Sequence, residues 1–165
     1  MSYHIYTTKG IVLSFQPLWE NDRVYNILTR DLGLLRATVL GARKESSKLR
    51  GNLEPYSLVQ VSLVRGKEYW RATSGEFISK ISVSPFVARP LSLIEKLVQG
   101  EMASPELFSA VEEALFSDVP RDEMFEVALV SKILFNLGYL KESDLNLDKK
   151  SLIAAINSGL EASHL

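Results

Sequence analysis

Cysteine is absent from the 165 residues of this sequence, and histidine occurs only twice, as His4 and His164 at opposite ends of the chain. Without cysteine the chain cannot form a disulfide framework or a thiolate metal site. Two histidines so far apart in sequence do not make a zinc motif. The sequence therefore predicts no metal and no other cofactor.

Long hydrophobic runs are also missing. The longest, at residues 127–130 and 133–135, are broken within a few residues by polar side chains, whereas a membrane-spanning helix needs about 20 mostly apolar residues. Neither a membrane anchor nor a signal peptide is predicted. Because the composition, 46% hydrophobic and 24% charged, is that of a globular protein, we expect a cytoplasmic protein without a membrane partner.

The motifs of common catalytic sites are missing as well. The sequence has no Ser/His/Asp set, no phosphate-binding Gly-Lys loop and no Glu-His metal spacing. Glu20 and Asp22 beside Arg23 are explained more simply as a turn or an ion pair than as an acid–base pair. We therefore expect no catalytic residues and no enzymatic activity.

Charge is distributed unevenly along the chain, although the net formal charge is only −1. Residues 1–80 carry twelve Lys and Arg against seven Asp and Glu, a net charge of +5, whereas residues 81–165 carry seven against thirteen, a net charge of −6. A basic first half predicts contact with a polyanion, and an acidic second half predicts contact with protein or solvent. The alternative is an uneven surface charge without a function.

The first half of the chain shows the alternating pattern of β-strands with turn signals between them. Residues 11–15 alternate as in a half-buried strand. Residues 23–30 and 34–40 form a predicted hairpin, because the Asp-Leu-Gly sequence at 31–33 supplies the residue types of a tight turn. A hairpin and a preceding strand together predict an antiparallel sheet.

Two more strands complete this pattern. One is predicted at residues 59–63, and a turn at 65–68 leads into another that begins at Tyr69. Five antiparallel strands with a longer polar connection between the third and fourth predict a five-stranded OB-type β-barrel over residues 1–81. An SH3-like barrel is the alternative, because strand count alone does not determine topology.

Residues 82–165 show helical periodicity and predict a small all-α domain, so that the fold class is α+β. Helices are expected to begin at Pro90, Ser104-Pro105, Asp122 and Asp148, and Gly100 is placed to end the first of them. The apolar positions at helical spacing are interpreted as core rather than as a ligand groove. They are Leu91, Ile94, Leu97, Val98, Val127, Val130, Ile133, Leu134, Leu137, Leu152, Ile153 and Ile156.

The connection after the third strand, residues 41–51, is the most informative segment. It holds Arg43, Lys44, Lys48 and Arg50 among small and hydroxyl-bearing residues that leave backbone N–H groups free to approach phosphate. Guanidinium groups bind phosphate oxygens in a fork and ammonium groups act as point charges, so the segment predicts nucleic-acid binding without sequence readout. Cations on the neighbouring strands extend the predicted surface: Lys9, Arg23, Arg36, Lys67 and Arg71.

Aromatic residues in or beside the strands offer a second indication. OB barrels that hold single strands stack bases on exposed rings, and Tyr25, Tyr56, Tyr69 and Trp70 are positioned for this role by sequence. A small barrel also needs large side chains to fill its interior. For each of these rings we therefore favour a place in the core.

Several short elements occur in order at residues 10–13, 20–23, 28–34, 41–44 and 47–56. Together they resemble the N-terminal OB domain of the RecO family of bacterial DNA repair and recombination mediators. Residues 125–139, which end in Asn-Leu-Gly-Tyr, are similar to the helix before the family's zinc-binding insertion, and residues 148–159 are similar to a later helix. At the insertion point residues 140–145 continue without cysteine, so the sequence resembles a shortened, zinc-free relative.

The resemblance implies binding of single- and double-stranded DNA and annealing of complementary strands. It also implies contact with the single-stranded DNA-binding protein and pairing with RecR to load recombinase. A protein-interaction adaptor with incidental DNA affinity is the alternative. Convergence of the cations on one exposed face favours DNA binding, whereas scattering of the cations, or their pairing with Glu45, Glu54 and Glu68, favours the adaptor.

Overall fold

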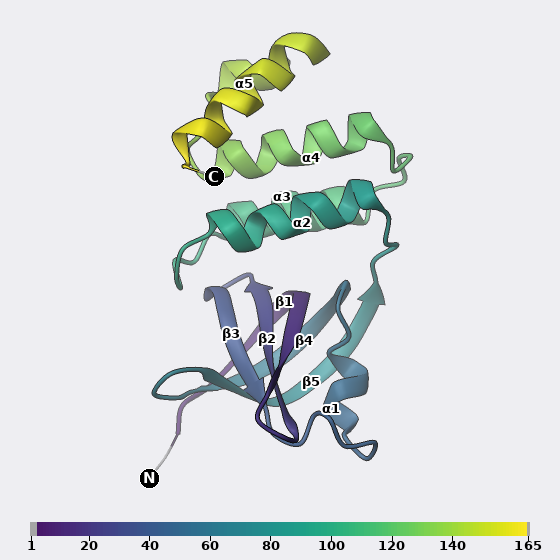
Figure 1. Cartoon of the computed structure of the whole chain (residues 1–165), viewed down its shortest axis with the longest axis vertical. Helices are drawn as coiled ribbons and strands as arrows, with labels where there is room; N and C mark the ends of the chain where they lie inside the picture. The colour runs from purple at the N-terminus through teal and green to yellow at the C-terminus, as the bar shows by residue number, and fades with distance from the viewer. Residues whose placement is uncertain (1–2, 165) are drawn as a thin grey trace. The chain divides into compact units, whose positions relative to one another are not determined.

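The computed structural model describes residues 3–164 and consists of two compact units (Figure 1). One unit comprises Met1–Ser82 and Gly100–Ser104, and the other comprises Val83–Gln99 and Pro105–Leu165. The first contains β1 (Ile5–Leu18), β2 (Asp22–Thr29), β3 (Gly33–Val39), α1 (Lys48–Asn52), β4 (Ser57–Arg65) and β5 (Trp70–Lys80). The second contains α2 (Pro85–Leu97), α3 (Pro105–Leu115), α4 (Glu123–Asn136), the 3₁₀ helix η1 (Glu142–Asn146) and α5 (Lys149–Ala162).

The five strands form a closed barrel in the order β1-β2-β3-β5-β4. All neighbouring pairs are antiparallel except β3 and β5, which run parallel with Ala37 opposite Trp70 and Thr38 opposite Arg71. Because β5 lies between β3 and β4, the barrel is not an up-and-down meander. This order, with a helix between β3 and β4, is that of the OB-type Greek-key barrel. The five predicted strands are confirmed, but the expectation that all of them are antiparallel is wrong, because β3 and β5 run parallel.

Alternation of side chains explains why these segments are strands. In β3, Leu35, Ala37 and Val39 point into the barrel and are buried, while Arg36 between them is exposed. The strand therefore contributes one apolar face to the core and one polar face to solvent. The long strand β1 carries an irregularity between Val12 and Ser14, and it pairs with β4 through its first half and with β2 through its second.

The connection after β3 contains a helix that the periodicity did not predict. Ser47 caps α1 by accepting a hydrogen bond from the Arg50 amide at 3.2 Å. Leu49 and Leu53 pack into the barrel core beside Gly75, where an added Cβ would lie 3.0 Å from the Leu53 side chain. The helix therefore depends on a glycine in β5 that leaves room for its leucines.

The helical unit differs from the prediction at its first helix. Pro90 does not open a helix but lies buried inside α2, which begins at Pro85 after Ser84. The Ser-Pro pair at 84–85 is the same start signal as the one at 104–105, and it places proline at the first helical position, where no N–H is needed. The starts predicted at Ser104-Pro105, Asp122 and Asp148 are confirmed by α3, α4 and α5.

Most of the apolar helical positions are core, as expected. Leu91, Ile94 and Leu97 of α2 are buried, and Leu134 of α4 has no exposed surface. Val127 and Val130 are half-buried and also line an open groove, so the α4 stripe is not entirely interior. Among residues 3–164, no helix combines the length and the hydropathy that a membrane crossing requires.

The segment Gly100–Ser104 contacts the barrel although it connects α2 and α3. The Glu101 carboxylate accepts hydrogen bonds from Arg65 at 2.7 Å and from the Trp70 indole N–H at 2.8 Å. Gly33, the first residue of β3, has φ +80, and a Cβ built there would lie 2.6 Å from the Met102 carbonyl oxygen. Glycine is therefore required at this position both by conformation and by the close backbone approach.

Substitution of Gly33 by alanine tests this second requirement. Alanine at a positive φ costs about 1–2 kcal/mol by itself, and the contact with the Met102 carbonyl adds a further steric penalty. Gly41 also has a positive φ of +68, but a Cβ built there would lie 3.6 Å from the Lys44 side chain, which is an ordinary contact. Gly41→Ala is therefore the matched control. We expect G33A to lower the free energy of unfolding, measured in urea, clearly more than G41A does. Equal effects would show that the close approach of the Met102 carbonyl adds no penalty.

Candidate nucleic-acid interface

All nine cations predicted for the interface lie on the barrel unit. Lys9, Arg23 and Arg50 are half-buried and the remaining six are exposed. Lys9 has an interaction within the chain, and none of the other eight cations forms an ion pair with a carboxylate within residues 3–164. The exposed guanidinium and ammonium groups thus keep their positive charge uncompensated by direct partners.

Strand pairing brings part of the set together on the outer face of β3 and β5. The guanidinium of Arg36 lies 4.9 Å from the centre of the Tyr69 ring, and Arg71 follows on β5 opposite Thr38. The Thr38 hydroxyl donates to the Trp70 carbonyl at 3.2 Å, which joins the two strands further. We call Arg36 and Arg71, together with Lys67 and Tyr69 of the adjoining β4–β5 turn, the strand-face cluster; it combines three cations with one half-buried ring.

A second group lies where the β1–β2 turn meets the segment after β3. The Gly41 amide donates to the Asp22 carboxylate at 2.7 Å, and the Arg43 amide donates to the Asn21 carbonyl at 2.9 Å. The Arg43 guanidinium donates to the Trp19 carbonyl at 3.4 Å. These bonds hold the two loops side by side, and we call Trp19, Arg23, Arg43 and Lys44 the loop cluster.

Arg23 belongs to the loop cluster through its neighbours in the sheet. It pairs with Pro17 of β1 and Val39 of β3, and its guanidinium lies 4.0 Å from the centre of the Phe15 ring. At this distance the ring face attracts the cation and fixes its position. Arg23 is thus held beside the loops, and it has no carboxylate partner in the part of the chain that the structure describes.

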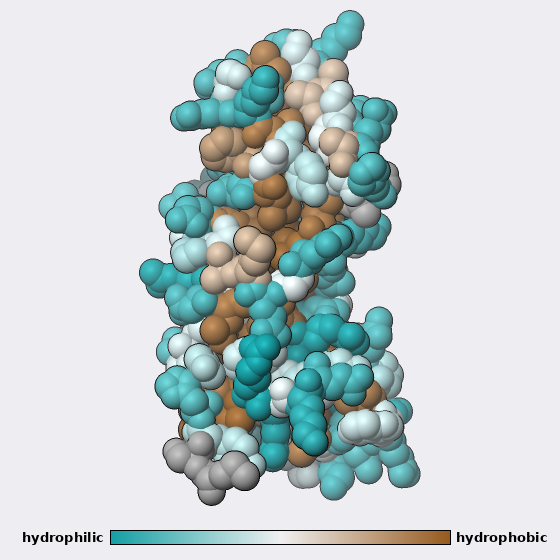
Figure 2. Space-filling model, turned by 90° about the vertical axis from the view of Figure 1, so that its left-hand side faces the viewer, coloured by the Kyte–Doolittle hydropathy of each residue, from teal (hydrophilic) through white to brown (hydrophobic). Residues whose placement is uncertain are grey.

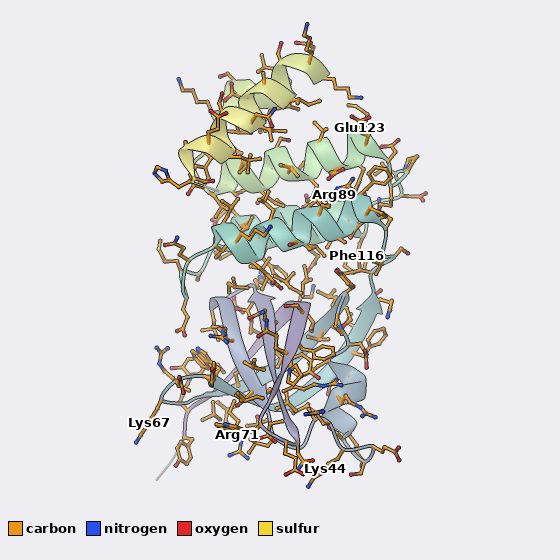
Figure 3. The ribbon with its side chains drawn as sticks, viewed as in Figure 1. Lys44, Lys67, Arg71, Arg89, Phe116 and Glu123 are labelled. Atoms are coloured by element: carbon orange, nitrogen blue, oxygen red, sulfur yellow. The ribbon has the colours of Figure 1, made fainter. Side chains whose placement is uncertain are left out.

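Members of both clusters lie toward one end of the barrel (Figure 3). Figure 3 shows Lys44, Lys67 and Arg71 there, with their side chains directed away from the barrel. Three different segments contribute them: the connection after β3, the β4–β5 turn and β5 itself. Residues distant in sequence therefore present positive charge in the same region.

The remaining predicted cations lie elsewhere on the barrel. Lys48 and Arg50 belong to α1, which Figure 1 draws on the opposite side of the barrel from the β4–β5 turn that carries Lys67. Lys9 lies on β1 opposite Gln60 of β4. The nine residues therefore do not form one continuous patch, because α1 turns the connection after β3 away from the strand face.

The aromatic residues divide between core and surface. Tyr25 and Trp70 are buried, with 0% and 4% of their surface exposed, which confirms the expected place in the core. Tyr56 and Tyr69 are half-buried. Trp19 was not among the predicted rings, yet it is the most exposed of the described Trp and Tyr side chains, at 75%.

A sequence signal for Trp19 existed. The residue lies in the short stretch Pro17-Leu18-Trp19-Glu20-Asn21, between two segments that alternate as strands. A large aromatic residue in the polar turn of a hairpin has no strand face to pack against. Its exposure could therefore have been predicted from the hairpin alone.

Open grooves lie on the helical unit. A groove of about 360 Å³ is lined by Val127, Val130 and Leu160 beside the Arg89–Glu126 ion pair, whose N–O distance is 2.7 Å. The hydrogen bond from Arg89 to Glu126 raises the pKa of the arginine above its ordinary value. Figure 2 shows hydrophobic side chains exposed among hydrophilic ones over the helices. Among the described residues, no group of three acidic or histidine side chains could hold a metal ion.

Comparison with known proteins gives a match over the barrel. The family model described as "Recombination protein O N terminal" matches residues 1–81. Three curated relatives are each named DNA repair protein RecO. A Synechococcus protein is 46% identical over 72 residues, which are 44% of this chain and 25% of the relative. A Gloeothece citriformis protein is 32% identical over 120 residues, which are 67% of this chain and 41% of the relative. A Nostoc protein is 28% identical over 145 residues, which are 80% of this chain and 48% of the relative. The chain thus spans at most about half the length of these relatives.

The bond between Asp22 and Gly41 gives a test of how the loop cluster is held. In Asp22→Ala the Gly41 amide loses its acceptor, which costs about 1 kcal/mol, and the two loops separate more often. Asp22→Asn keeps an acceptor oxygen and is the matched control. We expect faster hydrogen exchange of the Gly41 amide in D22A than in D22N by NMR. Equal exchange in both variants would show that the bond does not hold the loops.

Proposed function

Since the chain belongs to the RecO family through its residues 1–81, we propose that its barrel binds single- and double-stranded DNA through the strand-face and loop clusters. The family is one of DNA repair and recombination proteins. The observation that carries the proposal is a set of exposed cations on an OB-type barrel that have no carboxylate partner among residues 3–164. Barrels of this type bind oligonucleotides through the face of strands 2 and 3 and the adjoining loops.

The chemistry of the clusters supports binding to phosphate rather than to bases. Arg36 and Arg71 lie on neighbouring strands, and Arg43 and Lys44 extend from an adjacent loop. Guanidinium and ammonium groups in this arrangement neutralise phosphate charge and read no sequence. Each neutralised phosphate releases counterions, so the affinity falls as salt rises.

The same chemistry accounts for the finer activities that we propose by family resemblance. A surface that neutralises phosphate reduces the repulsion between two complementary strands and so promotes their annealing. We further propose that the chain contacts the single-stranded DNA-binding protein and acts with RecR to load recombinase. In this proposal it works by binding and has no enzymatic activity.

A protein-interaction adaptor remains the second candidate. The grooves of the helical unit, one of them lined by Val127, Val130 and Leu160, are a feature of protein-binding surfaces. The separation of Lys48 and Arg50 on α1 from the other cations also favours the adaptor (Figure 1). We keep DNA as the principal ligand because ion pairs with Glu45, Glu54 or Glu68 are absent from the described part of the chain.

A binding titration with labelled single-stranded and duplex oligonucleotides at several salt concentrations tests the proposal. Three glutamine variants separate the groups: the strand face (R36Q, K67Q, R71Q), the loop pair (R43Q, K44Q) and the α1 pair (K48Q, R50Q). A variant of the helical unit (K96Q, K141Q, K150Q) removes as much charge as the strand-face variant and is its control; all three of its lysines are exposed.

The wild-type chain is expected to bind both ligands and to weaken steeply with salt. Each lost phosphate contact reduces the slope of log K against log salt by about 0.7 for single strands and about 0.9 for duplex. We expect the strand-face and loop variants to lose affinity and slope, and the helical control to lose neither. Wild-type affinity in both the strand-face variant and the loop variant would exclude the two clusters as the site. Absence of binding to either ligand by the wild type would favour the adaptor.

A further inference from the structure

Trp19 combines two features that are unfavourable for an isolated chain. Its backbone has φ 51, in the left-handed region that bulky side chains rarely adopt. Its side chain is 75% exposed, so the indole ring gains little from burial. A residue held in a disfavoured conformation with an exposed ring indicates a role for the ring outside the folding of the chain.

The surrounding bonds hold the backbone of Trp19 while leaving the ring free. The Trp19 carbonyl accepts the hydrogen bond from the Arg43 guanidinium. Two residues later in the same loop, the Asn21 carbonyl accepts a hydrogen bond from the Arg43 amide. The Asp22–Gly41 bond joins the same two loops. The ring therefore projects from a loop that is anchored at several points, beside the cations Arg43 and Lys44.

We propose that Trp19 is a stacking platform for one unpaired base of a single-stranded nucleic acid, with Arg43 and Lys44 contacting the adjoining phosphates. This inference rests on the DNA-binding function proposed above and adds to it a preference for single strands. An indole face stacks on any unpaired base. In a duplex both faces of an internal base are already covered by its neighbours, so the platform has no ligand there.

The two tryptophans of the chain differ in a way that makes the proposal measurable. Trp70 is 4% exposed and its indole N–H is bonded to Glu101, so a ligand on the barrel surface reaches only Trp19 directly. Stacking of a base on Trp19 is expected to quench its fluorescence. In Trp19→Phe, which retains an aromatic face, only the emission of Trp70 remains.

The experiment titrates the full chain with a single-stranded thymidine oligonucleotide, with a duplex of equal length and with an abasic strand of equal length. For the wild type we expect quenching by the thymidine strand and little by the abasic strand. Trp19→Ala should bind the thymidine strand about tenfold more weakly, while its affinity for the duplex and the abasic strand changes less than twofold. Trp19→Phe should retain most of the affinity for the thymidine strand but lose the quenching.

Trp19→Gly separates a binding role from a structural one. Glycine adopts a positive φ without strain, so this variant should be at least as stable to urea as the wild type and still lose about tenfold in affinity for the thymidine strand. A marked loss of stability in W19G would make Trp19 a structural residue and overturn the inference. An equal loss for all three ligands in W19A, or no loss for any, would also overturn it while DNA binding itself stands. A wild type that binds none of the ligands would overturn both proposals.

Discussion

The parallel pairing of β3 with β5 is the constraint on which the arrangement of the barrel unit depends. It closes the barrel and brings Arg71 next to β3, on which Arg36 lies. It also requires the chain to leave β3, cross an end of the barrel and return as β4 before β5 can be added. α1 lies in that crossing, and the space beside Gly75 accommodates its leucines. The same pairing thus gathers the strand-face cations and separates Lys48 and Arg50 from them.

The cations are held by groups that leave their charge intact. Arg23 and Arg36 lie against aromatic rings, and Arg43 is bonded to a backbone carbonyl. A ring face or a carbonyl oxygen positions a guanidinium and leaves its charge intact. A carboxylate would also position the guanidinium, but its negative charge would neutralise the positive charge. Arg65 shows the contrast, because its partner is Glu101. Anchoring by neutral groups is the arrangement that a surface for a polyanion requires.

Where the sequence predicted the structure well, the physical signal was local. The strand positions followed from alternation, and the helix starts at Asp122 and Asp148 followed from residue types that favour the N-cap position. The helix start predicted at Pro90 was wrong because an equally strong start signal lies a few residues earlier, at Ser84-Pro85. Hydrophobic periodicity does not distinguish between two such signals. The helix α1 was missed because five residues are too few to show a helical period.

The sequence by itself determined the order of the five strands and the four longer helices, the unequal charge of the two halves and the supply of cations after β3, because each of these depends on residue types and short-range spacing. Tertiary structure alone decided which cations are neighbours, that Trp19 projects from an anchored loop, and that part of the α4 stripe faces a groove. These features depend on which strand pairs with which and on what covers each face. Such contacts join residues far apart in the chain, and no local pattern encodes them.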